Sequence, residues 1–169
     1  MRTLPSSGTV VANTAERDAP GVLVFPPVIP LTMLVVGAAL QWLTPLGWLT
    51  RLGPWRFGIG LMLALGGLIV AALGVRALRR RGTNVRPMLP TLAIATGGIF
   101  AWTRNPIYVG GIALSAGIAL TFGLDWALLL HPFGCLLLHR GVVLREERYL
   151  TRKFGDEYRC YQATVRRYL

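Results

Sequence analysis

The sequence predicts an all-α integral membrane protein with about four transmembrane helices and a cytoplasmic amphipathic C-terminal helix. Hydrophobic residues make up 53% of the 169-residue chain, and its mean hydropathy is +0.52. No charged residue occurs in 19–50 or 57–75, and Asp125 is the single charge in 105–139. A helix of about 20 apolar residues crosses the hydrocarbon core of a bilayer with its backbone hydrogen bonds satisfied internally. These stretches therefore predict membrane spans.

The first two spans are predicted at 26–44 and 57–78. The three prolines near the beginning of the first span are compatible with a helix only at its start. Trp48 and Trp55 lie in the short connection between the two spans, and tryptophan is enriched at membrane interfaces. The second span runs into an arginine-rich sequence, which indicates the end of that crossing.

The third and fourth spans, 107–122 and 125–139, are short and almost adjacent, so they predict a tight helical hairpin. We expect Gly123 to end the third helix and Asp125 to cap the fourth. Small residues recur every four positions on the third span, which lets a neighbouring helix approach closely. They form two sets, Gly111 with Ser115, and Ala113 with Gly117 and Thr121.

The segment before the third span, 82–106, is mostly apolar but is not predicted to be one helix. Pro87, Pro90 and the Gly97–Gly98 pair interrupt it. Irregular backbone at membrane depth occurs only where protein covers it or where it lines a cavity. The segment is therefore either the wall of a cavity or a plain cytoplasmic loop.

The two ends of the chain are polar. Residues 1–21 are predicted to be a flexible cytoplasmic tail, and 22–169 to be a single membrane domain. The C-terminal segment, 140–169, is too charged to span, and it predicts an amphipathic helix that can bend at Gly155. Its apolar face lies on the domain or on the membrane surface and consists of Leu150, Phe154, Tyr158, Tyr161 and Val165.

The net charge of +11 is distributed unevenly along the chain. Six arginines lie around the connection between the second and third spans, eight basic residues follow position 139, and only Arg51 and Arg56 lie between the first two spans. Basic residues accumulate on the cytoplasmic side of membrane proteins. The pattern predicts a protein of the bacterial plasma membrane with both termini in the cytoplasm, and it argues against nucleic-acid binding.

Cysteines and histidines do not indicate a metal centre or a disulfide framework. Cys135 and Cys160 form no CxxC pair, and His131 and His139 have no nearby carboxylate motif. We expect the histidines to have packing or interfacial roles. Asp125 as a functional carboxylate is the alternative to its role as a cap.

Two charged clusters indicate a binding site. In the first, Arg104 precedes Asn105 and Pro106, and proline is well suited to the first turn of a helix. The exposed N–H groups of that turn and the arginine favour an anionic group. The second cluster is Arg145-Glu146-Glu147-Arg148. If both clusters meet at the cytoplasmic face, they suit a zwitterion such as an amino acid headgroup, whereas separate clusters would be a snorkelling arginine and a solvated charge run.

The sequences GTNVRP and TGGIFAWTRNPIYVGG, followed by REERYLTRKFGDEYRCYQATVRRYL, resemble a known family. They are similar to the membrane methyltransferases typified by isoprenylcysteine carboxyl methyltransferase and related to phospholipid N-methyltransferases. The resemblance covers 82–169, about half of the chain. It implies that S-adenosylmethionine binds between the 82–106 loop, the start of the next helix and the tail.

The resemblance assigns roles to particular residues. The loop would enclose the cofactor with Ala93, Ile94, Ala95 and Phe100. The helix start would hold it with Asn105, Pro106, Ile107 and Tyr108. Glu146 would receive the amino group with support from Glu147, and Arg104 with Arg140 or Arg145 would steady the pocket or the acceptor. Asn105 stands where many relatives have histidine, so no histidine-dependent role is carried over.

The implied function is methyl transfer to a membrane-partitioned acceptor, foremost the carboxylate of an isoprenylcysteine-like substrate. A carboxylate needs no general base, whereas an amine would need one such as Glu147 or Tyr108. Two alternatives are an NADPH-dependent reductase similar to the sterol reductases and a non-catalytic scaffold or lipid-binding protein. The acceptor and the oligomeric state are open.

Overall fold

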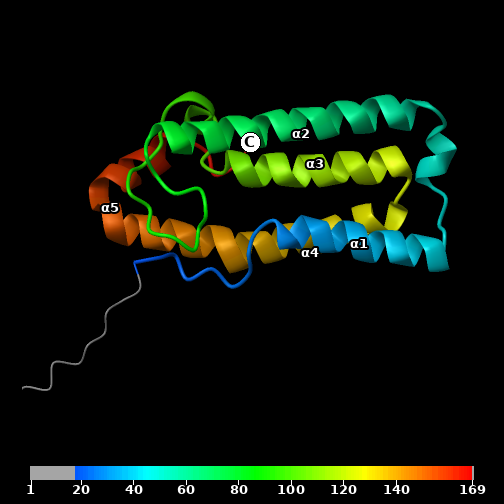
Figure 1. The fold of residues 1–169 in the computed structure, drawn as a ribbon, viewed down its shortest axis with the longest axis horizontal. Coiled ribbons are helices and arrows are strands. Elements are labelled where there is room, and N and C mark those ends of the chain that lie inside the picture. The colour runs from blue at the N-terminus through cyan, green and yellow to red at the C-terminus, as the bar shows by residue number, and fades with distance from the viewer. Residues whose placement is uncertain (1–17, 169) are drawn as a thin grey trace, which may run out of the picture.

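The structure is a computed structural model that describes residues 18–168, and within this range it is all-α (Figure 1). The helices are α1 Val28–Leu43, α2 Trp55–Arg80, α3 Pro106–Phe122, α4 Asp125–Leu138 and α5 Leu144–Thr164. Short 3₁₀ turns occur at Leu49–Leu52 and Gly98–Ala101, and a π-helical segment at His139–Val143. Helices α1 to α4 lie roughly along one long axis, and the 82–105 loop gathers with α5 at one end of the bundle.

The four apolar helices begin and end close to their predicted bounds. By length and composition, α2 and the continuous helix Asp125–Thr164 are sufficient to cross a membrane. Helices α1 and α3, with 16 and 17 residues, are shorter and also apolar. Many large apolar side chains on α2 face outward, including Phe57, Met62 and Ile69. The all-α class is confirmed, while the number of crossings stays a prediction.

Glycines bring α2 and α3 into backbone contact. Gly60, Gly67 and Gly74 are spaced by seven residues on α2, and Gly110 and Gly117 face them from α3. A Cβ atom added to Gly67 would lie 2.5 Å from the Leu114 nitrogen, and such contacts do not occur without movement. The seven-residue spacing keeps the small residues on one seam along the pair.

Only one of the two predicted small-residue sets lies in that seam. Gly117 and Thr121 contact α2 near Gly60, as expected. The prediction for Gly111 is wrong in this respect, because a Cβ at Gly111 would meet nothing within 4 Å. The neighbouring Gly110 makes the close contact instead, since the helix turns the two glycines about 100° apart.

The turn between α3 and α4 forms as predicted at Gly123, which adopts φ 67 at the end of α3. The expected capping role of Asp125 is wrong, because Leu124 is the N-cap of α4 and Asp125 is the first residue of the helix. Its buried carboxylate instead accepts hydrogen bonds from the backbone of Gly47 (2.9 Å) and Leu49 (2.8 Å) and from the Gln41 amide (3.0 Å). Asp125 therefore ties the α1–α2 connection to α4.

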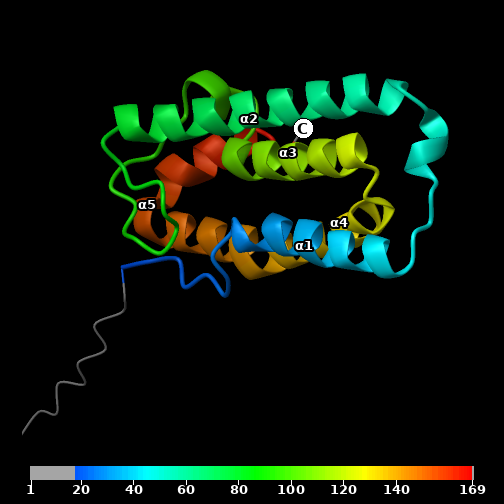
Figure 2. The ribbon, with the colours of Figure 1, turned by 45° about the vertical axis from the view of Figure 1, so that its right-hand side comes forward.

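Helix α4 ends at Leu138, close to the predicted 139. The chain stays helical beyond it, through the π-helical segment and into α5. The chain turns at Gly155, as expected, where φ is 55 and ψ is −126. This left-handed φ favours glycine. The last part of α5 then returns toward α3, as Figure 2 shows.

The segment before α1 lies against α5. Asp18 forms an ion pair with Lys153 at 2.7 Å, and the Leu23 nitrogen donates to the Gly141 carbonyl at 3.1 Å. The prediction of a flexible tail at 1–21 lies, for 1–17, outside the described residues. Within 18–21, Asp18 is bound by Tyr149 and Lys153, and the Gly21 carbonyl accepts from Arg145.

Candidate active site

A cavity lies at the arginine-rich end of the bundle, between the 82–105 loop, the start of α3 and α5. Thirteen residues were predicted to bind the cofactor or to act in catalysis, and eleven of them line this cavity. They are Ala93, Ile94, Ala95, Phe100, Arg104, Asn105, Pro106, Ile107, Tyr108, Glu146 and Glu147. The loop contains no helix beyond Gly98–Ala101. The loop is thus apolar because it forms part of the wall of a cavity, and it is not a plain solvent-exposed loop.

Pro106 is the first residue of α3, as predicted, and the end of the chain holds the residues just before it. The Arg104 nitrogen donates to the Arg166 carbonyl at 2.9 Å. The Asn105 side-chain amide donates to the Arg167 carbonyl at 3.0 Å, and the Thr103 hydroxyl donates to the same carbonyl at 3.2 Å. The C-terminal residues therefore position the start of α3. The periodicity of the sequence does not reveal these hydrogen bonds.

The two charged clusters meet, which is one of the two alternatives that the sequence left open. Glu147 is buried and lies between two arginines. Its carboxylate is 3.3 Å from Arg104 Nη2, and Arg167 binds both of its oxygens, with the shortest distance 2.8 Å. A carboxylate held by two guanidinium groups is a structural element of the wall. Arg167 is the member of this cluster that was not predicted.

Glu146 has a different partner. Its Oε2 atom accepts a hydrogen bond of 2.7 Å from the Tyr108 hydroxyl, which joins α5 to the first turn of α3. Burial raises the pKa of the Glu146 carboxyl, the Tyr108 hydrogen bond lowers it, and the nearby Glu147 raises it, with a net upward shift. Within residues 18–168, Glu146 forms no ion pair with an arginine, so its charge is compensated less than that of Glu147.

Arg104 has an unused donor. Its side chain is only 9% exposed, and its Nε atom has no hydrogen-bond partner within residues 18–168. A buried donor without a partner is costly, since native structures pair nearly all such groups. The cavity wall therefore combines an unpaired guanidinium donor from Arg104 with the carboxylate of Glu146, which fits a ligand that carries both an anionic and a cationic group.

Tyrosines of α5 hold the loop in place. The Tyr161 hydroxyl donates to the Phe100 carbonyl at 2.6 Å, and the Thr91 nitrogen donates to the Tyr149 hydroxyl at 3.1 Å. Burial raises the pKa of Tyr161 to about 12, against a lowering by Arg104. Tyr158 and Tyr161 also line the cavity. The spacing of Tyr158 and Tyr161 predicted an apolar helix face, and the structure adds the role of Tyr149 and Tyr161 as anchors of the loop.

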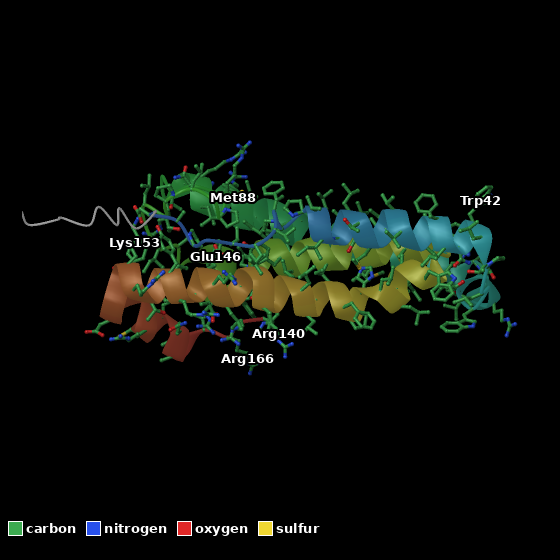
Figure 3. The ribbon with its side chains drawn as sticks, turned by 90° about the horizontal axis from the view of Figure 1, so that it is seen from below. Trp42, Met88, Arg140, Glu146, Lys153 and Arg166 are labelled. Atoms are coloured by element: carbon green, nitrogen blue, oxygen red, sulfur yellow. The ribbon has the colours of Figure 1, made fainter. Side chains whose placement is uncertain are left out.

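Arg140 and Arg145 do not line the cavity. Arg145 donates to the Gly21 carbonyl at 3.3 Å, and Arg140 is exposed. Figure 3 shows Arg140 with Arg166 along one edge of the molecule, whereas Met88 lies along the opposite edge. The structure thus separates these two arginines from the other eleven predicted residues.

The histidines have partners inside the fold. His131 lies 2.9 Å from the Ser115 hydroxyl and 2.6 Å from the Ala127 carbonyl, and His139 lies 2.8 Å from the Tyr168 hydroxyl. These are the packing roles expected for them. Both cysteines are free. In the described part of the chain, His, Cys, Asp and Glu side chains do not gather in groups of three or more that could hold a metal ion.

A second cavity, which is predominantly apolar, adjoins the first. Its walls come from α1, α2 and α3 and include Leu31, Leu34, Val75, Ile112 and Ile118. The two cavities share five lining residues, Val85, Arg86, Pro87, Ile107 and Tyr108. The first cavity, which we call the polar cavity because Arg104, Glu146 and Glu147 line it, therefore adjoins the apolar cavity between the helices, and these five residues form their common wall.

Comparison with known proteins agrees with this arrangement. The family described as phospholipid methyltransferase matches residues 55–157, which include α2, the loop, α3, α4 and the first turns of α5. A curated Haemophilus influenzae protein, described as uncharacterized, is 53% identical over 34 residues, or 20% of this chain and 54% of that protein. The chain thus aligns with about half the length of that relative. No solved structure matches significantly. Since the family match covers more than half of the chain, the protein belongs to the phospholipid methyltransferase family.

Proposed function

We propose that this protein transfers a methyl group from S-adenosylmethionine to a lipophilic acceptor that partitions into the membrane. The observation that carries the proposal is the junction of two unlike cavities at Tyr108. One is lined by Glu146, Arg104 and the loop, and the other by apolar residues of three helices. A water-soluble donor and a membrane-soluble acceptor need such adjoining chambers.

The polar cavity suits the amino acid part of the cofactor. The Glu146 carboxylate would receive the ammonium group, and the unpaired Nε of Arg104 would donate to the carboxylate. Ala93, Ile94, Ala95 and Phe100 would enclose the remainder from the loop, and Asn105, Pro106 and Ile107 would border it at the start of α3. When bound, S-adenosylmethionine supplies an electrophilic methyl group on a sulfonium.

The apolar cavity would hold the hydrocarbon part of the acceptor. Leu31, Leu34 and Ile118 offer walls without charge, so a chain could lie there with its polar end toward Tyr108. The protein then contributes by placing the two reactants in line and by excluding water from the junction. The tail tyrosines that anchor Phe100 and Thr91 would keep the loop closed over that junction.

Within the proposal, a carboxylate acceptor such as isoprenylcysteine is favoured over an amine. Glu147 is engaged by Arg104 and Arg167, so it is not free to accept a proton. Arg86 lines both cavities, and it forms no ion pair with the described residues. A guanidinium at the junction would bind an anionic end group. Arg140 and Arg145 would act only indirectly, from outside the cavity.

The proposed topology has four crossings, by α1 to α4, with both termini on the cytoplasmic side. Support comes from the arginines at the end of α2 and on α5, which lie at the same end of the bundle. In this arrangement the polar cavity opens toward the cytoplasm, where the cofactor is available.

The test is incubation of the purified protein with methyl-labelled S-adenosylmethionine and separate acceptor classes. Label in a prenylated cysteine carboxyl ester would support the proposal, and base-labile release of the label as methanol would identify the ester. Label in phosphatidylethanolamine would retain the enzyme class but overturn the carboxylate acceptor. Calorimetric binding of NADPH but not of S-adenosylmethionine would favour the reductase, and binding of neither would favour the scaffold.

A further inference from the structure

The outer face of α2 carries a groove that shares only Ala95 with the polar cavity and no lining residue with the apolar one. Its main walls are Leu73, Arg76, Arg80, Arg81, Ile99 and Trp102, which come from the end of α2 and from the loop around the Gly98–Ala101 turn. We name it the α2 groove. Figure 1 shows the loop arching over this end of α2. These arginines are not among the predicted site residues.

The arginines of the groove have no compensating acid. Residues 19–124 contain no Asp or Glu, and Arg76, Arg80 and Arg81 form no ion pair with the described residues. Arg81 reaches the loop, because its Nη2 atom lies 3.9 Å from where a Cβ would stand on Gly97. Three guanidinium groups at one helix end would bind a phosphate with several charge-assisted hydrogen bonds.

Apolar surface continues below the arginines. A neighbouring groove on α2 shares Arg76 and Arg80 and adds Leu68, Ala72 and Val75 along the helix toward the middle of the bundle. Trp102 stands at the charged end with 79% of its surface exposed. An amphipathic indole beside basic residues is typical of the headgroup region of a membrane. The surface thus combines cationic groups for a headgroup with an apolar track for an acyl chain.

We propose that the α2 groove, together with the neighbouring groove, binds one anionic phospholipid as a ligand, with its phosphate at Arg76, Arg80 and Arg81 and one acyl chain along Leu68 and Ala72. A free phosphate would use the arginines but not the apolar track, so the lipid is the occupant that both features fit. The α2 groove also adjoins the polar cavity, because Ala95 lines both. A bound lipid would therefore stabilise the outer side of the 82–105 loop, whose inner side lines the polar cavity.

The test uses tryptophan quenching in the full-length protein, purified in an uncharged detergent. Phosphatidylglycerol and phosphatidylcholine with the same brominated acyl chains are titrated, and Trp102→Phe isolates the signal of Trp102. We expect saturable quenching of Trp102 by phosphatidylglycerol, with about tenfold more phosphatidylcholine needed for the same effect. Equal quenching by the two lipids would overturn the proposal, as would displacement of the lipid by low inorganic phosphate.

A matched pair of variants locates the headgroup. Arg76→Gln with Arg80→Gln should weaken phosphatidylglycerol quenching by about tenfold or more, since each arginine contributes to anionic-lipid attraction. Arg148→Gln with Arg166→Gln removes the same charge from exposed positions of the tail and should change it by less than about twofold. Equal losses in both variants would show a general charge effect and reject the site. The comparison of the two lipids in the unmodified protein decides the question even if a variant does not fold, and none of these readouts depends on methyl transfer.

Discussion

The Tyr108 hydroxyl donates a hydrogen bond of 2.7 Å to Glu146 Oε2, and this contact joins the first turn of α3 to α5 at the point where the polar and apolar cavities meet. Tyr108 lines both cavities, whereas Glu146 lines only the polar one. The pair therefore forms the boundary between the proposed donor and acceptor sites.

Replacing Tyr108 with phenylalanine should weaken cofactor binding without unfolding the protein. The change removes a hydrogen bond to a charged group, which contributes about 1.5–3 kcal/mol, so we expect a loss of roughly tenfold or more in affinity. Calorimetric titration with S-adenosylmethionine measures it. Tyr168→Phe is the matched control, because that hydroxyl contacts His139 away from the cavity. Equal affinity in Tyr108→Phe and the unmodified protein would reject the role of the pair.

Cofactor affinity should rise with pH through the titration of Glu146. Its pKa is raised above the usual 4.5, and the ammonium of the cofactor requires the ionised carboxylate. The affinity is therefore at its full value above the raised pKa of Glu146, and it is lost as the pH falls through that pKa. Titrations from about pH 5 to about pH 8 measure the midpoint. Glu146→Gln should bind weakly at every pH, and a variant that kept the pH dependence would contradict the assignment.

The same shift predicts an effect on stability. A carboxyl whose folded pKa is raised binds its proton more tightly in the folded state, so ionised Glu146 costs stability above pH 4.5. Glu146→Gln removes that cost and keeps an acceptor for Tyr108. We expect its unfolding temperature in detergent at neutral pH to equal or exceed that of the unmodified protein. A marked decrease would show that the ionised group stabilises the fold.

Glu147 should behave in the opposite way. Removal of its carboxylate by Glu147→Ala leaves Arg104 buried without a partner, and breaking such a pair costs about 3–5 kcal/mol. Thermal unfolding should therefore shift strongly downward. Asp156→Asn is the control, because it breaks an exposed pair with Arg159 that contributes at most about 1 kcal/mol. Similar shifts in both variants would contradict the structural role of Glu147.

Adjacent glycines on α2 and α3 should respond differently to alanine. Gly67→Ala and Gly110→Ala place a methyl group against the partner backbone, which costs about 1–3 kcal/mol through overpacking. Gly66→Ala and Gly111→Ala meet nothing within 4 Å and should gain up to about 1 kcal/mol from helix propensity. Detergent unfolding of the four variants measures the contrast. Equal stability within each pair of neighbours would reject the glycine seam.

Local patterns in the sequence predict the helices and most of the candidate site. Charge-free stretches place α1 to α4 within a few residues of their bounds, because apolar length is a local property. Pro106 and Gly123 mark the two ends of α3 through their backbone preferences. The cavity-lining residues follow from two motifs that resemble those of a known methyltransferase family, since each motif is contiguous in the chain.

Only the tertiary structure decides which side chains pair. Glu146 and Glu147 are adjacent, yet one binds Tyr108 and the other Arg104 and Arg167, because α5 points them at different neighbours. Asp125 resembles a helix cap in sequence, but burial beside the α1–α2 connection gives it three donors from outside its own helix. Sequence spacing determines which face of a helix a residue occupies, whereas the packing of distant segments determines what that face meets.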